Sequence, residues 1–124
     1  MTMPPPPMVK PPEEITKEVP LAFRLPGEER IKIADFCPLT GKIVSISMTF
    51  DECNGLVHVA FGHSDKWVSP SEINTFISLS STTRVVPGLS EPVVKNEHLW
   101  AEIRNGDVLP HTISVIATII GRDS

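Results

Sequence analysis

The sequence lacks the motifs on which the common enzyme classes depend. It contains no G-x-G-x-x-G, G-x-x-x-x-G-K-[ST], H-E-x-x-H, G-x-S-x-G or C-x-x-C. These patterns are typical of nucleotide-binding sites, zinc proteases, hydrolases with a serine nucleophile and dithiol redox proteins. Taken together, their absence leaves no basis for a specific activity, so we expect a protein that is not an enzyme and uses no cofactor.

Positive charge and long apolar runs are also scarce. The chain has 11 Lys and Arg against 15 Asp and Glu, for a net charge of −4, and no basic cluster of the kind that binds phosphates. No apolar run approaches the roughly 20 residues of a membrane span. The N-terminus lacks the charged-then-apolar layout of a signal peptide. We therefore expect no nucleic-acid or membrane partner and a protein made and kept in a cytoplasm.

Cysteine is rare and tyrosine is absent. Cys37 and Cys53 have no secretory context, so we expect both to be reduced, small hydrophobic side chains rather than a disulfide. Cys53 with His58 would make a poor nucleophile pair, because no residue nearby would orient the histidine.

Proline is plentiful, and it divides the chain. Of the 13 prolines, seven fall within the first 20 residues, at Pro4–Pro7, Pro11, Pro12 and Pro20. Proline fixes φ and donates no backbone hydrogen bond, so this segment is neither a helix nor a central strand. We expect an extended arm over residues 1–18 and one globular domain over residues 19–124, which is long enough for a single core.

The rest of the chain shows the period-2 alternation of strands with one buried face. No segment has the pattern of a long helix. Many short strands separated by turn signals are typical of an antiparallel β-sandwich or jelly roll, which is the predicted fold. The predicted strands cover residues 19–25, 30–36, 42–50, 56–61, 83–86, 93–95, 98–104 and 112–119. The predicted core is Val44, Ile46, Met48, Val57, Val59, Phe61, Leu99, Ile103, Ile113 and Val115.

The strongest pattern is the C-terminal segment His98–Ile120, which contains two alternating strands joined by a polar turn. If the two strands pair with each other, their buried residues fall on the same face when Ile103 lies opposite Ile113. This register places Trp100 opposite Ile116 on the other face. Asp51–Gly55 likewise indicates a hairpin between the two strands that flank it.

One short helix is a further possibility. Ser69 is followed by Pro70 at the first helical position and by Glu72 three residues on, which is the pattern of a capping box. This predicts a helix over Pro70–Phe76, with extended structure through Asn74–Leu79 as the alternative.

The candidate binding residues are few. His58 and His63, with Asp65, His98 and His111, lack the His-x-His spacing of a cupin-type metal barrel, and we expect no metal. Trp67 lies among Ser, Asp and Lys residues, where an aromatic ring could stack on a sugar. The alternative is that each Trp fills a core or an interface.

Three features of the sequence are similar to those of a known family: the proline-rich arm, the acidic sandwich and two runs of residues near the C-terminus. The runs are Leu99-Trp100-Ala101-Glu102-Ile103-Arg104-Asn105 and His111-Thr112-Ile113-Ser114-Val115. Together these features resemble the small β-sandwich virion proteins of tailed bacteriophages, such as capsid decoration or cement proteins and fibre-attachment domains. The resemblance covers about residues 40–120 and transfers no functional residue.

The resemblance implies a non-enzymatic virion protein that forms a homo-oligomer, often a trimer. It also implies a larger protein shell as partner, such as one built from a major capsid protein. The residues expected to contact partners are Met3, Pro5, Met8, Val9, Pro11, Trp67 and Trp100. Two alternatives are a carbohydrate- or ligand-binding sandwich that uses Trp67, and a metal-dependent cupin-like enzyme that uses the histidines.

Overall fold

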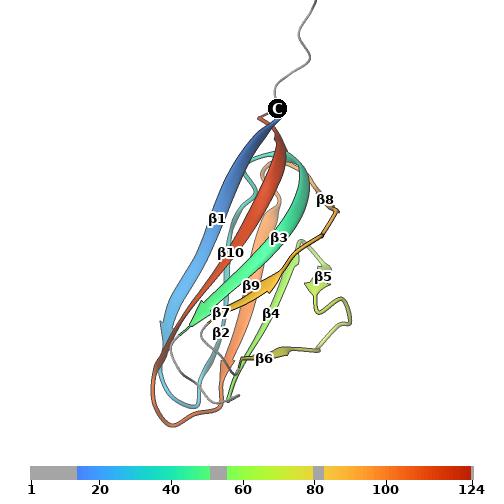
Figure 1. Ribbon diagram of the computed structural model, residues 1–124. Coiled ribbons are helices and arrows are strands. Elements are labelled where there is room, and N and C mark those ends of the chain that lie inside the picture. The colour runs from blue at the N-terminus through green and yellow to red at the C-terminus, as the bar shows by residue number, and fades with distance from the viewer. Residues whose placement is uncertain (1–13, 51–55, 80–82, 124) are drawn as a thin grey trace, which may run out of the picture.

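The computed structural model describes residues 14–50, 56–79 and 83–123, and within them it is entirely β-structure (Figure 1). The predicted fold class is confirmed. No helix that could span a membrane occurs in these three segments. The strands are β1 (Ile15–Leu25), β2 (Arg30–Phe36), β3 (Thr40–Phe50), β4 (Val57–His63), β5 (Lys66–Ser69), β6 (Ile77–Leu79), β7 (Thr83–Val86), β8 (Glu91–Val93), β9 (His98–Asn105) and β10 (His111–Arg122).

Two antiparallel sheets of five strands pack face to face. Sheet A has the order β1-β10-β3-β7, with β8 also paired to β3. Sheet B has the order β2-β9-β4-β5, with β6 also paired to β4. The long strands give the molecule two ends (Figure 1): one carries the start of β1 and the end of β10, and the other carries the β1–β2 and β9–β10 connections.

The alternation places the apolar side chains between the sheets. Every predicted core residue is buried except Val44, whose place is taken by Ile43. The cause is an irregularity in the β10–β3 ladder between Thr118 and Ile119. Thr118 pairs with Ser45, but Ile119 pairs with Ile43, so Val44 is skipped and Ile43 takes the buried face. The sequence pattern alone did not reveal this shift.

The predicted pairing of the C-terminal strands is wrong. β9 pairs with β2 and β4 in sheet B, whereas β10 pairs with β1 and β3 in sheet A. Ile103 and Ile113 are therefore both buried in the core but lie in different sheets, and Trp100 does not lie opposite Ile116. Alternation identifies the buried face of a strand, but it does not say in which of two sheets the strand lies.

The predicted hairpin between β3 and β4 is wrong for the same reason, because the two strands lie in different sheets. The turn proposed for it, Asp51–Gly55, lies outside the described residues. The predicted helix over Pro70–Phe76 is also wrong. The segment makes only a turn, closed by bonds from Thr75 to the carbonyl of Glu72, and the chain then enters β6.

β1 begins at Ile15, earlier than the predicted start at Val19, and its whole length pairs with β10. It is an edge strand, which is where a proline such as Pro20 can be accommodated without loss of a ladder hydrogen bond. β8 spans Glu91–Val93 rather than Val93–Lys95.

We expect the two neighbouring residues of β3 to respond differently to truncation. Ile43→Ala should lower the free energy of unfolding by about 2–4 kcal/mol, because it leaves a cavity in the core. Val44→Ala should cost less than about 1 kcal/mol, because that side chain is only half-buried. Chemical denaturation of both variants tests the register, and the reverse order would contradict it.

Candidate interaction surfaces

The outer face of sheet B carries a cluster of aromatic rings. Ala34, Trp100, Gly62 and Trp67 form one row across β2, β9, β4 and β5. The two indole rings meet above Gly62, with centroids 4.9 Å apart and planes at 74°. Phe76 lies edge-on to Trp67, with centroids 5.7 Å apart. Edge-to-face contacts of this kind add to the stability gained by burying the rings.

Two cations cover this cluster. The Lys32 ammonium lies 4.3 Å from the centre of the Trp100 ring, and the Arg104 guanidinium lies 4.1 Å from that of Phe76. The Trp100 indole N–H donates to the carbonyl of Ser64 at 2.9 Å. Trp100 is only 3% exposed although it lies on an outer face. The cluster is therefore a small secondary core outside the sheet.

Gly62 makes the cluster possible. A Cβ at this position would overlap both the Trp100 ring and the carbonyl oxygen of Lys66. The indole can lie across β4 only because that strand presents bare backbone there.

The structure thus brings Trp67 and Trp100 together, which the sequence did not indicate. Trp67 is half-buried and has ring contacts on two sides, an arrangement better suited to packing than to stacking on a sugar. Partner binding by these two residues stays a prediction. The other candidates, Met3, Pro5, Met8, Val9 and Pro11, lie outside the described residues.

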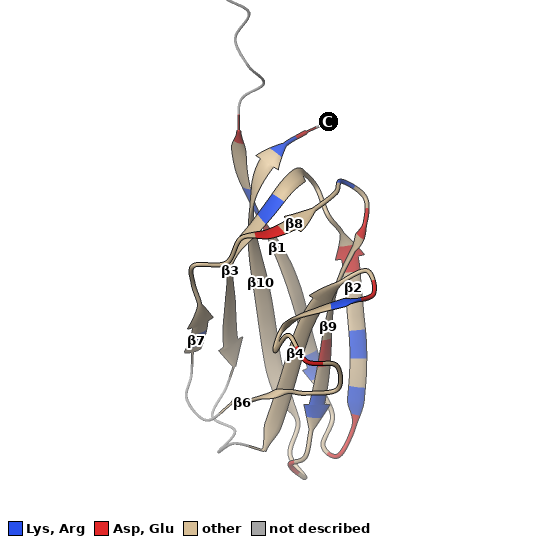
Figure 2. Ribbon diagram, turned by 90° about the vertical axis from the view of Figure 1, so that its right-hand side faces the viewer, with Lys and Arg blue, Asp and Glu red and all other residues tan. Residues whose placement is uncertain are grey.

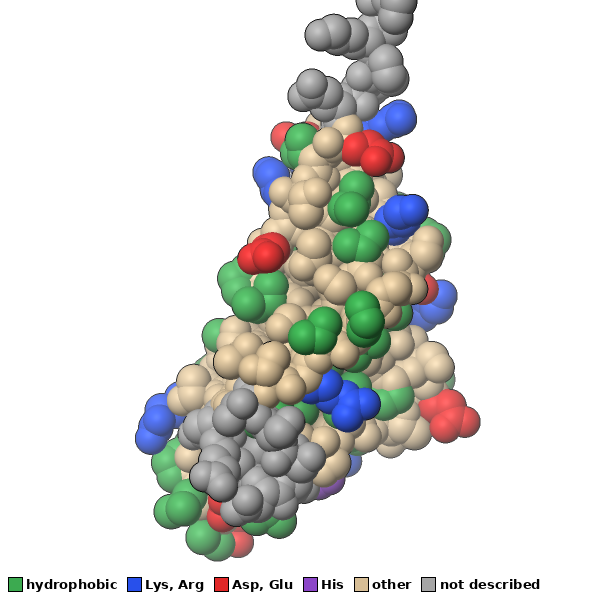
Figure 3. Space-filling model, viewed as in Figure 1, with side chains coloured by type: hydrophobic (Ala, Val, Ile, Leu, Met, Phe, Trp, Pro, Cys, Tyr) green, Lys and Arg blue, Asp and Glu red, His purple; other side chains and the backbone are tan. Residues whose placement is uncertain are grey.

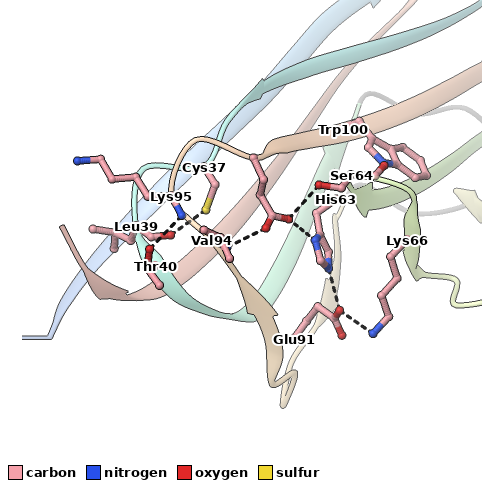
Figure 4. A network of polar contacts seen from close by, with 11 residues as sticks. Cys37, Leu39, Thr40, His63, Ser64, Lys66, Glu91, Val94, Lys95 and Trp100 are labelled. Carbon is pink, nitrogen blue, oxygen red and sulfur yellow. Dashed lines mark hydrogen bonds and ion pairs between the residues drawn. The ribbon is translucent and has the colours of Figure 1, made fainter. Parts of the chain in front are cut away.

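A polar network joins the two sheets at the end that carries Thr40, which pairs with Arg122 at the end of β10 (Figure 4). His63, the last residue of β4, contacts Glu97 through Nδ1 and Glu91 on β8 through Nε2, the latter at 2.8 Å. Lys66 also binds Glu91, at 2.7 Å. The second carboxylate oxygen of Glu97 accepts from the backbone N–H of Val94 at 2.8 Å.

The network holds structure together rather than supporting catalysis. Both ring nitrogens of His63 face carboxylates, Glu97 at Nδ1 and Glu91 at Nε2, and not a hydroxyl or a thiol that could act as a nucleophile. The hydroxyl of Ser64 lies 3.5 Å from Glu97, not beside the imidazole. The Cys37 thiol is buried and donates to the carbonyl of Leu39, and burial raises its pKa, which disfavours the thiolate.

The histidines do not converge. His58 and His63 lie on opposite faces of β4, as their odd separation predicts, while His98 lies against the ring of Phe36 and His111 binds Asp107. No group of three His, Cys, Asp or Glu in the described segments is arranged to hold a metal ion. The expectation that the protein binds no metal stays a prediction.

At the opposite end, the β9–β10 connection is held by Asn105, which is 3% exposed. Its side-chain amide donates to the carbonyls of Leu25, Pro26 and Leu109 at 2.9–3.2 Å. Its carbonyl oxygen accepts from the backbone N–H of Asp107 at 2.9 Å. Two separate loops are therefore bonded to one buried side chain.

This connection presents apolar side chains to solvent. Val108 is 74% exposed and Leu109 61%, and Leu56 beside them is 45% exposed. The three residues are here called the tip, and Figure 3 shows hydrophobic side chains gathered at this lower end of the molecule. From the sequence, this connection was expected to be a polar turn. The adjacent aliphatic residues Val108 and Leu109 within a loop could have indicated an exposed apolar surface.

A hollow of about 440 Å³ lies on sheet A near the other end of β10. The hollow is defined by Glu14, Thr40, Gly41, Lys42, Ser90, Pro92, Ile120, Gly121 and Arg122. Gly41 and Gly121 are paired across β3 and β10, and the backbones approach so closely that a Cβ on either would overlap the other strand.

We expect Gly62→Ala to destabilise the protein by about 1–3 kcal/mol through overpacking, with a shift in tryptophan emission. The shift would report on this cluster alone, because the chain has two tryptophans, both within it, and no tyrosine. Ala34→Ser, in the same row but on the exposed edge strand, should change neither property. Unchanged stability and emission in Gly62→Ala would contradict the packing described above.

Glu91 should contribute to acid sensitivity. Burial on its own raises the pKa of Glu91, but hydrogen bonds from Lys66 and His63 outweigh it, so the pKa lies below the ordinary value of 4.5. The stabilisation is therefore fully present above pH 4.5 and is lost as the pH falls through the folded pKa. Glu91→Gln should lower the free energy of unfolding at pH 7 by about 1–3 kcal/mol.

Denaturation of wild type and Glu91→Gln between pH 3 and 7 measures this effect. The variant should lose less stability on acidification than the wild type does. Asp123→Asn is the matched control, since Asp123 is exposed and its pKa is lowered by the Lys95 ammonium and not by His63 or Lys66. Parallel pH profiles for wild type and Glu91→Gln would show that the network does not stabilise the fold.

No protein-family model matches the sequence, and no curated protein sequence does. Solved structures do match. A chain of the cyanophage Pam1 capsid asymmetric unit matches 98% of this chain and 94% of its own length, with 11% identity and a TM-score of 0.54. The Yersinia pseudotuberculosis-derived mitogen matches 85% and 87%, with 9% identity and a TM-score of 0.49. A turnip yellow mosaic virus chain matches 98% and 87%, with 10% identity and a TM-score of 0.38.

Of these three, only the cyanophage chain exceeds a TM-score of 0.5, and at 11% identity the likeness concerns the fold alone. It is not specific to decoration proteins of tailed phages, the family that the sequence resembles. The chain therefore shares its two-sheet β-sandwich fold with the cyanophage capsid chain.

Proposed function

We propose that the protein is a non-enzymatic structural component of a virion, a capsid decoration or cement protein of a bacteriophage. In this role it forms homo-oligomers and attaches to a larger shell, such as one built from a major capsid protein, through its arm and loops. The observation that carries the proposal is the two-sheet fold shared, over nearly the whole of both chains, with a chain of a cyanophage capsid.

The chemistry of the described residues supports a structural role. The ionisable cluster around His63 has its hydrogen-bonding groups engaged with one another and ties sheet A to sheet B. Three of the eight exposed large hydrophobic side chains of the described residues, Leu56, Val108 and Leu109, lie at the tip. Contiguous exposed apolar residues on a soluble protein mark sites of contact with other macromolecules.

The arm supports the proposal through its energetics. Ordering a residue costs on the order of 1 kcal/mol in backbone entropy. The few apolar side chains of the arm, including Met3, Met8 and Val9, offset that cost only if they are buried against a partner. Proline cannot donate to a sheet edge, so an extended segment in a groove is the mode of binding that suits this composition.

Removal of residues 1–13 tests the proposed role of the arm. The truncation ends before Ile15, because Ile15–Lys17 pair with Ile119–Gly121 in sheet A. We expect an almost unchanged thermal midpoint, together with weaker assembly measured by light scattering and by binding to the shell.

The control is a chain that keeps its length but carries a Gly/Ser segment in place of residues 1–13, which should assemble as weakly as the truncated form. Full-length and truncated proteins that assemble equally well would remove the arm from the proposal.

A further inference from the structure

We propose that copies of this protein associate head to tail, with the tip of one copy seated in the hollow of the next. This inference rests on the proposed assembly role and specifies the two surfaces by which one copy recognises another. The tip is Leu56, Val108 and Leu109, and the hollow is the recess around Gly41 and Gly121.

The tip is preorganised for binding. In addition to the four hydrogen bonds of Asn105, the backbone N–H of Glu28 donates to the carbonyl of Asp107 at 2.8 Å. Gly27 packs so closely on Val108 that a Cβ there would overlap its carbonyl group. A loop already fixed in this way loses little conformational entropy when its exposed side chains are buried by a partner.

The hollow offers matching space. Its volume of about 440 Å³ falls within the range of roughly 300–1,000 Å³ that is typical of binding pockets. Pro92 and Ile120 supply apolar surface, while Gly41 and Gly121 contribute only backbone. Aliphatic side chains entering the hollow would therefore contact Pro92 and Ile120, while the charged side chains of Glu14, Lys42 and Arg122 complete the lining.

The charges around the two surfaces are complementary. Glu28 and Glu29 are exposed beside the tip, whereas exposed Lys42 and Arg122 flank the hollow, where Glu14 is the one acidic lining residue. Figure 2 shows acidic positions on the loops at the lower end of the molecule, and it shows basic positions on the strands at both ends. Opposite charges steer and orient association, and a symmetric tip-to-tip contact would instead bring Glu28 and Glu29 of both copies together.

The positions of the two surfaces make the association heterologous. The tip lies just before the start of β10, and the hollow lies at the end of β10, which is formed by Gly121 and Arg122. The 12 residues of β10, or roughly 40 Å of strand, therefore separate the tip from the hollow. Each copy therefore offers both a tip and a hollow, and repeated contacts give a ring or an open chain. Addition of a neighbour to the edge of β1 is disfavoured, because Pro20 lies within that strand and has no N–H to donate.

Sedimentation of the full chain with two variants tests the inference. The tip variant is Val108→Ser with Leu109→Ser, and the hollow variant is Lys42→Glu with Arg122→Glu. All four positions are exposed, so thermal midpoints should stay close to that of the wild type. The wild type should grow in mass with concentration, and each variant alone should associate at least about ten-fold more weakly, a loss of roughly 1.4 kcal/mol.

An equimolar mixture of the two variants gives the sharpest result. The tip variant keeps an intact hollow and the hollow variant keeps an intact tip, so the mixture should form heterodimers and stop there. Ile73→Ser, at a residue that is 70% exposed elsewhere on the surface, should assemble as the wild type does.

Three results would overturn the inference: a wild type that stays monomeric at every concentration, a tip variant that assembles normally, or a mixture without heterodimers. If the tip variant assembles normally while removal of residues 1–13 abolishes assembly, the occupant of the hollow is the arm rather than the tip. In that case the proposed virion role stands, whereas a wild type that neither self-associates nor binds a shell contradicts both.

Discussion

The buried side chain of Asn105 lies where the chain crosses between the two sheets, and much of the architecture depends on it. The β1–β2 connection passes from sheet A to sheet B, and the β9–β10 connection passes back at the same end. Asn105 bonds to the carbonyls of Leu25 and Pro26 in the first connection and to Leu109 in the second. Because a buried amide without partners is costly, this arrangement favours one geometry for both crossovers.

The two ends of the sandwich differ in which side chains they bury and which they expose. At the Asn105 end, polar groups are turned inward to hold the loops, and aliphatic side chains are turned outward. At the other end, the His63 network closes the gap between the sheets, and the recess between Gly41 and Gly121 lies on the surface. A molecule with an apolar projection at one end and a recess at the other is suited to repeating contacts, which is consistent with the proposed role in assembly.

Local periodicity predicted the fold class and the buried face of most strands, because both depend on short-range alternation. It did not predict which strands pair, since β9 and β10 would show the same pattern in one sheet or in two. The exchange of Val44 for Ile43 depends on a ladder irregularity at Thr118, far away in sequence. Likewise, Trp67 and Trp100 meet only because the fold places Gly62 between them. A candidate interaction surface that combines distant segments, such as the tip, can be recognised only from the tertiary structure.

The central claim is that this chain works as part of a large assembly. The most direct measurement is the size of the complex that contains it in the cells that make it, obtained by gradient sedimentation of an untreated lysate with detection of the protein across the fractions. We expect most of the protein to sediment with particles far larger than a single chain. Recovery of all of it at the position of a free monomer would contradict the proposed role in assembly.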